Sequence, residues 1–160
     1  SATGPRKEVI ENYKTALSLN GDIARGRKVF ETVCIACHRA GDLGTADLGP
    51  NLANIRAWNS GQVLINILDP NREVVPTFIA YTIETKNGRT IFGIIAGESS
   101  ASLMIKRPDG VTETVLRQDI SMITGSGQSL MPDGMESAIP PQAMADLIAF
   151  LLAPVTNENE

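Results

Sequence analysis

Both cysteines and the only histidine of this 160-residue chain fall within five consecutive residues, Cys34-Ile35-Ala36-Cys37-His38. The C-x-x-C-H pattern is typical of covalent haem attachment, in which two thiols add across the two vinyl groups of the porphyrin. The imidazole that follows the second cysteine is then placed to become the proximal ligand of the iron. The sequence therefore predicts one haem c, held through Cys34 and Cys37, with His38 on its iron.

Two other interpretations of the cysteine pair stay open. A thioredoxin-like redox pair needs a strand before the motif and a helix that begins at it, whereas a helical pattern here ends at Cys34. A structural zinc site needs about four nitrogen, sulfur or oxygen ligands. No further Cys or His remains after Cys34, Cys37 and His38, so we favour haem over both alternatives.

The second axial ligand has to come from another side chain, because the chain has no second histidine and five methionines. Three methionines fall in predicted strands or in the last predicted helix, where packing is the expected role: Met104, Met122 and Met144. The other two lie in a glycine-containing loop predicted from Thr124 to Ile139. Pro132 restricts Met131 to an extended conformation. We expect Met131 as the distal ligand; Met135, or an iron that is open, water-bound or lysine-ligated, is the alternative.

The ligand set decides the chemistry. Coordination by His38 and Met131 saturates the iron and raises its reduction potential relative to two imidazoles. A saturated iron has no vacancy for peroxide or dioxygen, so we expect an electron carrier that moves single electrons, and no enzyme. An open sixth position would instead suit a haem sensor or a peroxidase with a labile distal ligand.

Further residues near the motif are candidates for supporting the haem. The carbonyl of Pro50 could accept the free N–H of the proximal imidazole and fix its tautomer, although an ordinary turn proline is equally compatible. Arg56 and Trp58 could pair with or hydrogen-bond the haem propionates, or be ordinary surface and core residues. Four aliphatic residues are expected to contact the ring: Leu43, Leu48, Leu52 and Ile55.

Composition and charge narrow the class of protein. The hydrophobic content of 42% and the charged content of 20% are those of a globular chain. A formal net charge of −4 argues against a nucleic-acid partner, and no apolar run approaches the ~20 residues of a transmembrane segment. Haem c is attached outside the cytoplasm. We therefore expect a periplasmic or otherwise extracytoplasmic location, with the signal sequence cleaved or the chain cut from a longer protein.

Hydrophobic periodicity predicts helices on both sides of a strand-rich block. The helices are expected at Pro5–Leu19, at Ile23 to about Val33 with Asp22 as N-cap, at Ser60–Leu68 with Ser60 as cap, and from Pro140-Pro141 to Leu152. Gly26 is a poor helix former, which indicates either a tolerated substitution or close contact with a crossing helix. An irregular stretch, Arg39–Asn51, is expected to wrap a ligand.

The strand-rich block lies between the third and fourth helices. Alternating residues predict strands at 77–85, 90–97, 103–106, 111–116 and 120–123. Asn87-Gly88 predicts a hairpin with a type I′ turn, and Pro108-Asp109-Gly110 predicts a second turn. Four or five antiparallel strands are enough for a small sheet or a closed SH3-like barrel.

Residues 22–70 and 124–152 resemble class I c-type cytochromes. The shared features are Gly26 and Phe30, the haem motif, Gly49-Pro50-Asn51-Leu52, Leu130-Met131-Pro132 and Asp146-Leu147-Ile148-Ala149-Phe150-Leu151. The resemblance implies that Gly26 and Phe30 pack near Leu147 and Phe150. It also implies a Pro50 carbonyl on the His38 imidazole and Met131 as the distal ligand.

The whole pattern is most similar to the haem-binding (cytochrome c) domain of the planctomycete–verrucomicrobial type. The features that carry this are the Gly-Asp-x-x-x-Gly-x-x-Val-Phe lead into the haem motif, Leu68-Asp69-Pro70-Asn71, the strand block and the segment Ser129–Glu136. That resemblance implies a domain of a long secreted protein, which accepts electrons from a dehydrogenase partner or an attached dehydrogenase-like module. The helix at Pro5–Leu19 would join the two.

We therefore predict a mainly α chain with the class I cytochrome c fold around one haem and an inserted antiparallel β-sheet or barrel, α+β in total. Residues 1–20 are assigned to an N-terminal helix or linker, 21–153 to the cytochrome domain, 77–123 to its β insertion, and 154–160 to a tail. The insertion could also be a docking module or the contact of a homodimer. Five basic residues form either a rim for an acidic redox partner or a solvated helix face: Arg25, Arg27, Lys28, Arg39 and Arg56.

Overall fold

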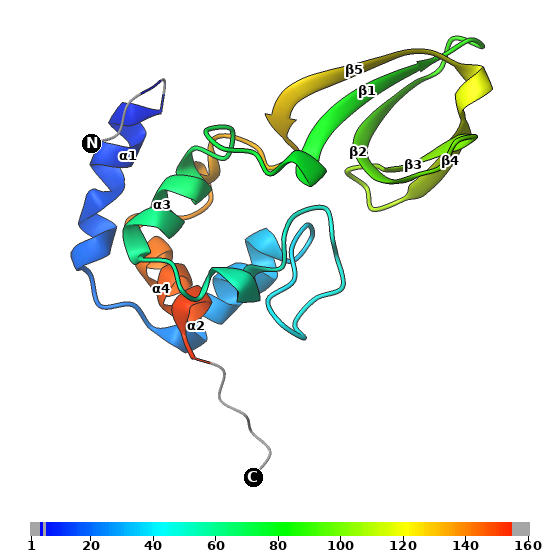
Figure 1. The fold of residues 1–160 in the computed structure, drawn as a ribbon. Helices are drawn as coiled ribbons and strands as arrows, with labels where there is room; N and C mark the ends of the chain where they lie inside the picture. Colours follow the sequence, from blue (N-terminus) through cyan, green and yellow to red (C-terminus); the bar gives the residue numbers. More distant parts are fainter. Residues whose placement is uncertain (1–3, 5, 155–160) are drawn as a thin grey trace.

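The computed structural model describes residue 4 and residues 6–154, which form a helical lobe and a curled β-sheet that projects from it (Figure 1). The predicted helix start at Pro5 and the predicted tail residues 155–160 lie outside the described residues, as do residues 1–3. The α-helices of the described part are α1 (Lys7–Tyr13), α2 (Ile23–Val29), α3 (Ser60–Leu68) and α4 (Pro141–Leu152). All four lie in the helical lobe.

The helix ends follow from local hydrogen bonds. The first predicted helix is α-helical only to Tyr13 and continues as a 3-10 helix, η1 (Lys14–Ser18). Asp22 caps α2 as predicted, because its carboxylate accepts from the backbone N–H of Arg25 at 2.8 Å. The prediction that Ser60 caps α3 was wrong: the cap is Asn59, which forms a reciprocal capping box with Gln62.

Helices α2 and α4 cross in close contact. Gly26 is buried, and a Cβ added there would overlap the backbone carbonyl of Asp146. One turn later, the rings of Phe30 and Phe150 lie 5.7 Å apart between centroids and are tilted by 47°, an arrangement that aromatic pairs favour. The expected close contact at Gly26 is confirmed, and it explains why a poor helix former occurs within a helix.

The sheet has five antiparallel strands in the order β4-β3-β2-β1-β5. They are β1 (Ile79–Thr85), β2 (Thr90–Glu98), β3 (Ser102–Lys106), β4 (Thr112–Leu116) and β5 (Ile120–Ser129). The two outer strands, β4 and β5, are not paired with each other within the described residues, so the insertion is a curled sheet and the closed barrel was the wrong alternative. Its own small core is aliphatic: Ile83, Ile91, Leu103, Ile105 and Val115.

The last strand is longer than predicted. β5 runs to Ser129 instead of ending at Ile123, so the predicted loop at Thr124–Ile139 begins only at Leu130. Gly125 and Gly127 look like loop residues in the sequence. In the structure they lie in the strand, which absorbs them through a shift in register opposite Ile79 and Tyr81. The chain consequently enters the helical lobe directly from a sheet edge.

The hairpin between β1 and β2 forms where it was predicted, but with a different turn. Type I′ requires a positive φ at both central residues, whereas only Gly88, at φ +85°, has one. The bonds Gly88 N–H to Thr85 C=O and Thr85 N–H to Arg89 C=O fit a type I turn followed by a glycine bulge.

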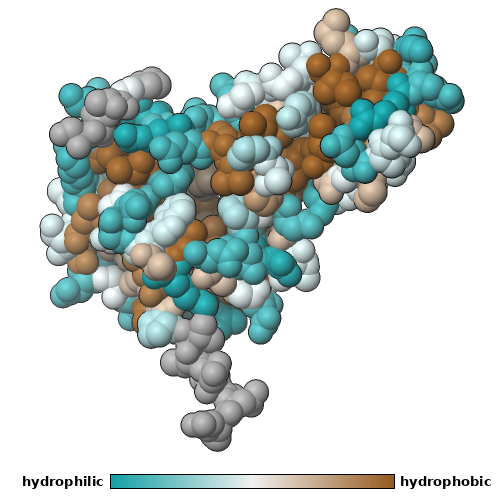
Figure 2. Space-filling model, viewed as in Figure 1, coloured by the Kyte–Doolittle hydropathy of each residue, from teal (hydrophilic) through white to brown (hydrophobic). Residues whose placement is uncertain are grey.

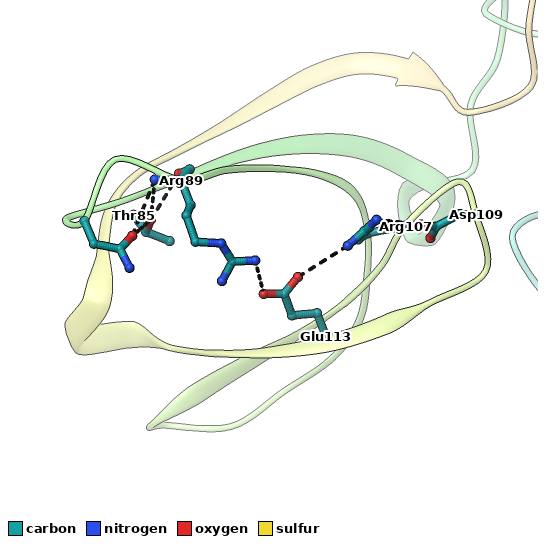
Figure 3. Close-up of polar contacts among 6 residues, drawn as sticks. Thr85, Arg89, Arg107, Asp109 and Glu113 are labelled. Carbon is teal, nitrogen blue, oxygen red and sulfur yellow. Dashed lines mark hydrogen bonds and ion pairs between the residues drawn. The ribbon is translucent and has the colours of Figure 1, made fainter.

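Charged side chains span the open side of the curled sheet. Arg89, just after the hairpin turn, reaches Glu113 on β4 at 2.5 Å, and Arg107 approaches the same carboxylate at 3.9 Å and Asp109 at 2.5 Å (Figure 3). On the side towards the helices, Lys106 pairs with Asp47 in the loop after the haem motif. Within the described residues, no helix combines the length and apolar character needed to cross a membrane.

Candidate haem site

A cavity of about 320 Å³ lies between the helices and the base of the sheet, and it is lined by the two cysteines and the histidine of the C-x-x-C-H motif. Figure 2 shows hydrophobic side chains around a hollow where the two lobes meet. Its walls come from α3 (Val63, Ile67), α4 (Leu147, Leu151) and the segment that leads into β1 (Val75, Phe78). These walls are apolar. The volume of the cavity lies within the range of small-molecule and cofactor sites, roughly 300–1,000 Å³.

The motif is positioned by a π-helical turn at the end of the second helix. This turn, η2 (Phe30–Cys34), continues α2 to the first cysteine, and π-turns of this kind are frequent at functional sites. The backbone then folds back, because the N–H groups of Cys37 and His38 both donate to the Cys34 carbonyl, at 3.1 and 2.9 Å. Both thiols and the imidazole consequently line the same cavity.

The imidazole of His38 is fixed in both orientation and tautomer. Its Nδ1 lies 2.8 Å from the carbonyl oxygen of Pro50, the contact that the sequence predicted. A carbonyl can only accept, so Nδ1 carries the proton and Nε2 keeps its lone pair. Gly49 packs flat against the ring, since a Cβ there would overlap all three of the ring atoms nearest to it.

Burial decides the electrostatics of the motif. It raises the pKa of the Cys34 thiol to about 11, with a smaller contribution from Cys37, and it also raises the pKa of Cys37. A thioredoxin-like pair needs the opposite, a thiol pKa lowered at a helix N-terminus, so that alternative is disfavoured. Burial lowers the pKa of His38, and the bond to Pro50 offsets part of this effect. A neutral imidazole is the form that binds a metal.

Both candidate methionines also line the cavity. Met131 and Met135 line the cavity together with Leu130 and Pro132, so the cavity brings the predicted thioether and His38 to one site from opposite ends of the sequence. Of the three methionines expected to be packing residues, only Met144 is buried. Met104 and Met122 are exposed by 44% and 55%, because their strands turn that face to solvent.

The remaining predicted residues divide into two groups. Pro50, Leu52 and Trp58 line the cavity, and Trp58 stays 38% exposed at its edge. Arg56 and Leu43 are not among the lining residues. The residues of α3 and of the segment before β1 were missed as site residues. The apolar face of α3 was visible in the sequence, but nothing indicated which ligand it faced.

The basic residues around the motif are partly used within the fold. Arg25 donates to the buried carboxylate of Asp146 through Nε and Nη2, at 2.8 and 2.9 Å, and Arg27 pairs with Glu31. Both side chains are exposed and already paired within the chain, so for Arg25 and Arg27 the alternative of a solvated helix face fits better than a rim kept for an acidic partner. Asp146, which binds α4 to the start of α2, was missed in this role.

The residues of the cavity fit a covalently held haem. Two thiols at the right spacing, an imidazole of fixed tautomer and a thioether all line one apolar cavity. Within the described part of the chain, no cluster of three or more His, Cys, Asp or Glu residues is arranged to hold a bare metal ion.

Fold and site together define an α+β chain with a candidate haem c site. Residues 23–78 match the family model of cytochrome c, which supports a c-type cytochrome and haem-based electron transfer in general. The matched segment starts at α2, includes Cys34, Cys37 and His38, and ends where β1 begins. A comparison with curated proteins gave no match.

Proposed function

We propose that this chain is a mono-haem c-type cytochrome domain that carries single electrons, with His38 and Met131 as the two axial ligands. The observation that supports it most directly is the shared cavity of Cys34, Cys37, His38 and Met131. When bound, the haem iron supplies the chemistry by cycling between the ferric and ferrous states. The protein's part is to hold, orient and seal it.

Each residue has a separate role in this proposal. Cys34 and Cys37, which both line the cavity, form the thioether bonds. The Pro50 carbonyl keeps His38 in the tautomer that ligates through Nε2. Leu52 and the apolar walls exclude water. Trp58 and Arg56 are proposed propionate partners at the rim, with Trp58 the better supported of the two because it lines the cavity.

The proposed setting follows from the resemblance stated above. We infer an extracytoplasmic domain of the planctomycete–verrucomicrobial type that accepts electrons from a redox protein or a fused dehydrogenase module. Contact near Trp58 and Val75 would bring a partner close to the haem, since both side chains line the cavity and remain 38% and 54% exposed.

The axial assignment is tested by visible spectra of the haem-loaded protein in both oxidation states. Met131→Ala is compared with Met135→Ala, a matched control because both methionines line the cavity. Loss of the far-red methionine-to-iron charge-transfer band in Met131→Ala alone, together with new carbon monoxide binding and a lower potential, supports the proposal. If Met135→Ala gives these changes instead, Met135 is the ligand. If the reduced wild type already binds carbon monoxide at neutral pH, the haem sensor or peroxidase replaces the electron carrier.

A second candidate function is self-association, in which two copies of this chain form a homodimer through the β insertion. β5 is an outer strand of the sheet, its residues 121–128 are exposed, and the sequence from 120 to 132 has no charged residue. Natural edge strands usually carry charge that prevents self-pairing, and an uncharged strand meets no like charge when it pairs with its own copy. Sedimentation of wild type and Ile123→Lys tests this: a dimer lost in the variant supports it, and a monomeric wild type at micromolar concentration rejects it.

A further inference from the structure

The segment that carries Met131 has no regular structure of its own. It leaves β5 at Ser129 and passes through Leu130 to Gly134 before a short 3-10 turn, η6 (Met135–Ser137), begins. A loop without helical or strand hydrogen bonds holds a side chain at a fixed position only if other groups restrict its backbone. Here the restriction comes from hydrogen bonds made by the residues on either side of Met131.

The bonds converge on one asparagine. The backbone N–H of Met131 donates to Ser129 Oγ at 3.0 Å. The backbone N–H of Ser129 in turn donates to Asn71 Oδ1 at 2.9 Å. The other half of the same amide, Asn71 Nδ2, donates to both carboxylate oxygens of Asp133 at 3.3 Å. One side chain thus bridges the two arms of the loop, two residues before and two residues after Met131.

Asn71 is itself held by the helical core and not by the loop. It lies in the turn that ends α3, in which the N–H of Arg72 donates to the carbonyl of Asp69 at 3.2 Å. Leu68, Asp69 and Pro70, the three residues before it, are buried. The cavity wall supplied by α3 and the loop supplied by β5 are therefore connected through this amide.

We propose that Asn71 is a positioning residue that holds the Met131 loop against the haem cavity. The inference rests on the proposed function, because it matters for the iron only if Met131 is its distal ligand. Without the bridge, Met131 samples positions away from the cavity, and a ligand from solution competes with it more easily. Asparagine suits this role because its amide offers an acceptor to Ser129 and a donor to Asp133 at once.

Three variants separate the bridge from a general structural effect. Asn71→Ala removes both contacts. Asn71→Asp keeps an acceptor for the Ser129 N–H but places two carboxylates opposite each other. Asn71→Asp combined with Asp133→Asn restores the bridge with donor and acceptor exchanged between the two residues. Asn12→Ala, at an exposed position of α1, is the matched control for loss of an asparagine.

The experiment titrates the ferric, haem-loaded protein with imidazole and follows the far-red methionine-to-iron band. We expect Asn71→Ala and Asn71→Asp to bind imidazole about tenfold more tightly than wild type and to show a weaker band. The double variant is expected to recover wild-type affinity to within about threefold, and Asn12→Ala to remain unchanged.

Two results overturn the inference while the proposed function stands: single variants with wild-type imidazole affinity, or a double variant that fails to recover. A wild type that lacks the band overturns both, because Met131 is then not the ligand. Urea midpoints of all variants accompany the titration. An imidazole effect that follows the loss of global stability across the series, Asn12→Ala included, would assign the role of Asn71 to folding and reject the proposal.

Discussion

The imidazole ring of His38 packs on the backbone of Gly49, with no room for a side chain between them. Gly49 is held there by its own N–H, which donates to the carbonyl of Cys37 at 2.9 Å. The carbonyl of the next residue, Pro50, accepts a hydrogen bond from Nδ1 of the same imidazole. Two adjacent residues thus build the proximal side of the site. Gly49 leaves room for the imidazole ring because it has no side chain, and the Pro50 carbonyl orients the ring through its hydrogen bond.

Gly49→Ala should therefore displace His38 without straining the backbone, since Gly49 does not have a positive φ. The methyl group has to push the ring or the loop away. We expect a loss of roughly 1–3 kcal/mol in stability, as for other overpacked sites, and a weakened low-spin spectrum. Urea unfolding and visible spectra of the haem-loaded variant check this. Gly97→Ala in β2, where a Cβ would make ordinary contacts, should leave the spectrum unchanged; equal spectra for both variants would contradict the steric argument.

Gly26→Ala tests the crossing of α2 and α4. A gain of about 1 kcal/mol in helix propensity is expected from replacing glycine, but the new Cβ overlaps the Asp146 carbonyl, which is backbone and cannot rotate away. The helices must separate and weaken the Phe30–Phe150 contact. We expect a net loss of about 3 kcal/mol or more, measured by urea unfolding. A stabilised variant would show that the helices are not in close contact.

The acid limit of stability should depend on Asp146. This carboxyl is 3% exposed. Its hydrogen bonds from the Arg25 guanidinium first, and also from the Asp22 N–H and the Gln142 amide, lower its pKa from the ordinary 3.8 to about 2. The unfolded chain therefore takes up this proton at a higher pH than the folded one. The stability that Asp146 contributes is complete above about pH 4 and is lost as the pH falls towards 2.

Asp146→Asn should cost roughly 2 kcal/mol at pH 7 through the loss of charge-assisted hydrogen bonds, and the difference from wild type should shrink near pH 2. Urea unfolding at both pH values measures this. The control is Asp47→Asn, which removes the pairing of an exposed carboxylate with Lys106 and should cost less than about 1 kcal/mol. A cost for Asp146→Asn that is the same at both pH values would rule out the ionised carboxylate as its source.

The N-terminal helix should stabilise the segment between the Met131 loop and α4. Tyr13 Oη, from the end of α1, lies 2.8 Å from the Glu136 carbonyl and 3.0 Å from the Ile139 carbonyl, and Arg6 pairs with the Glu136 carboxylate at 2.5 Å. Tyr13→Phe should cost about 1 kcal/mol in urea unfolding. Tyr81→Phe in the sheet is the control, expected within about 0.5 kcal/mol. No difference between them would mean that the Tyr13 hydroxyl does not contribute to the stability of this contact.

Predictions from the sequence were most accurate where a local rule acts. The C-x-x-C-H motif, the Asp22 cap and the hairpin at Asn87-Gly88 each depend on residues within a few positions of one another. Two errors concerned local details, the cap of α3 and the type of the hairpin turn. The larger errors arose where tertiary contacts override such rules. Two glycines suggested that the chain leaves the sheet at residue 124, but pairing with β1 extends β5 to Ser129. Arg25 resembled a free surface cation because its partner, Asp146, is distant in sequence.

The sequence by itself determined which groups this protein has for chemistry: two thiols three residues apart, one imidazole beside them, and five thioethers elsewhere. The order and spacing of Cys34, Cys37 and His38 along the chain do not depend on the fold. The attachment motif could therefore be recognised from the sequence alone. The tertiary structure decided which other side chains share a cavity with that motif. Only the path of β5 into the helical lobe brings Met131 and Met135 to the cavity of His38, and only the turn after α3 places Asn71 across the loop that carries Met131. Such contacts between distant segments depend on how the helices and the sheet pack, which no local pattern specifies.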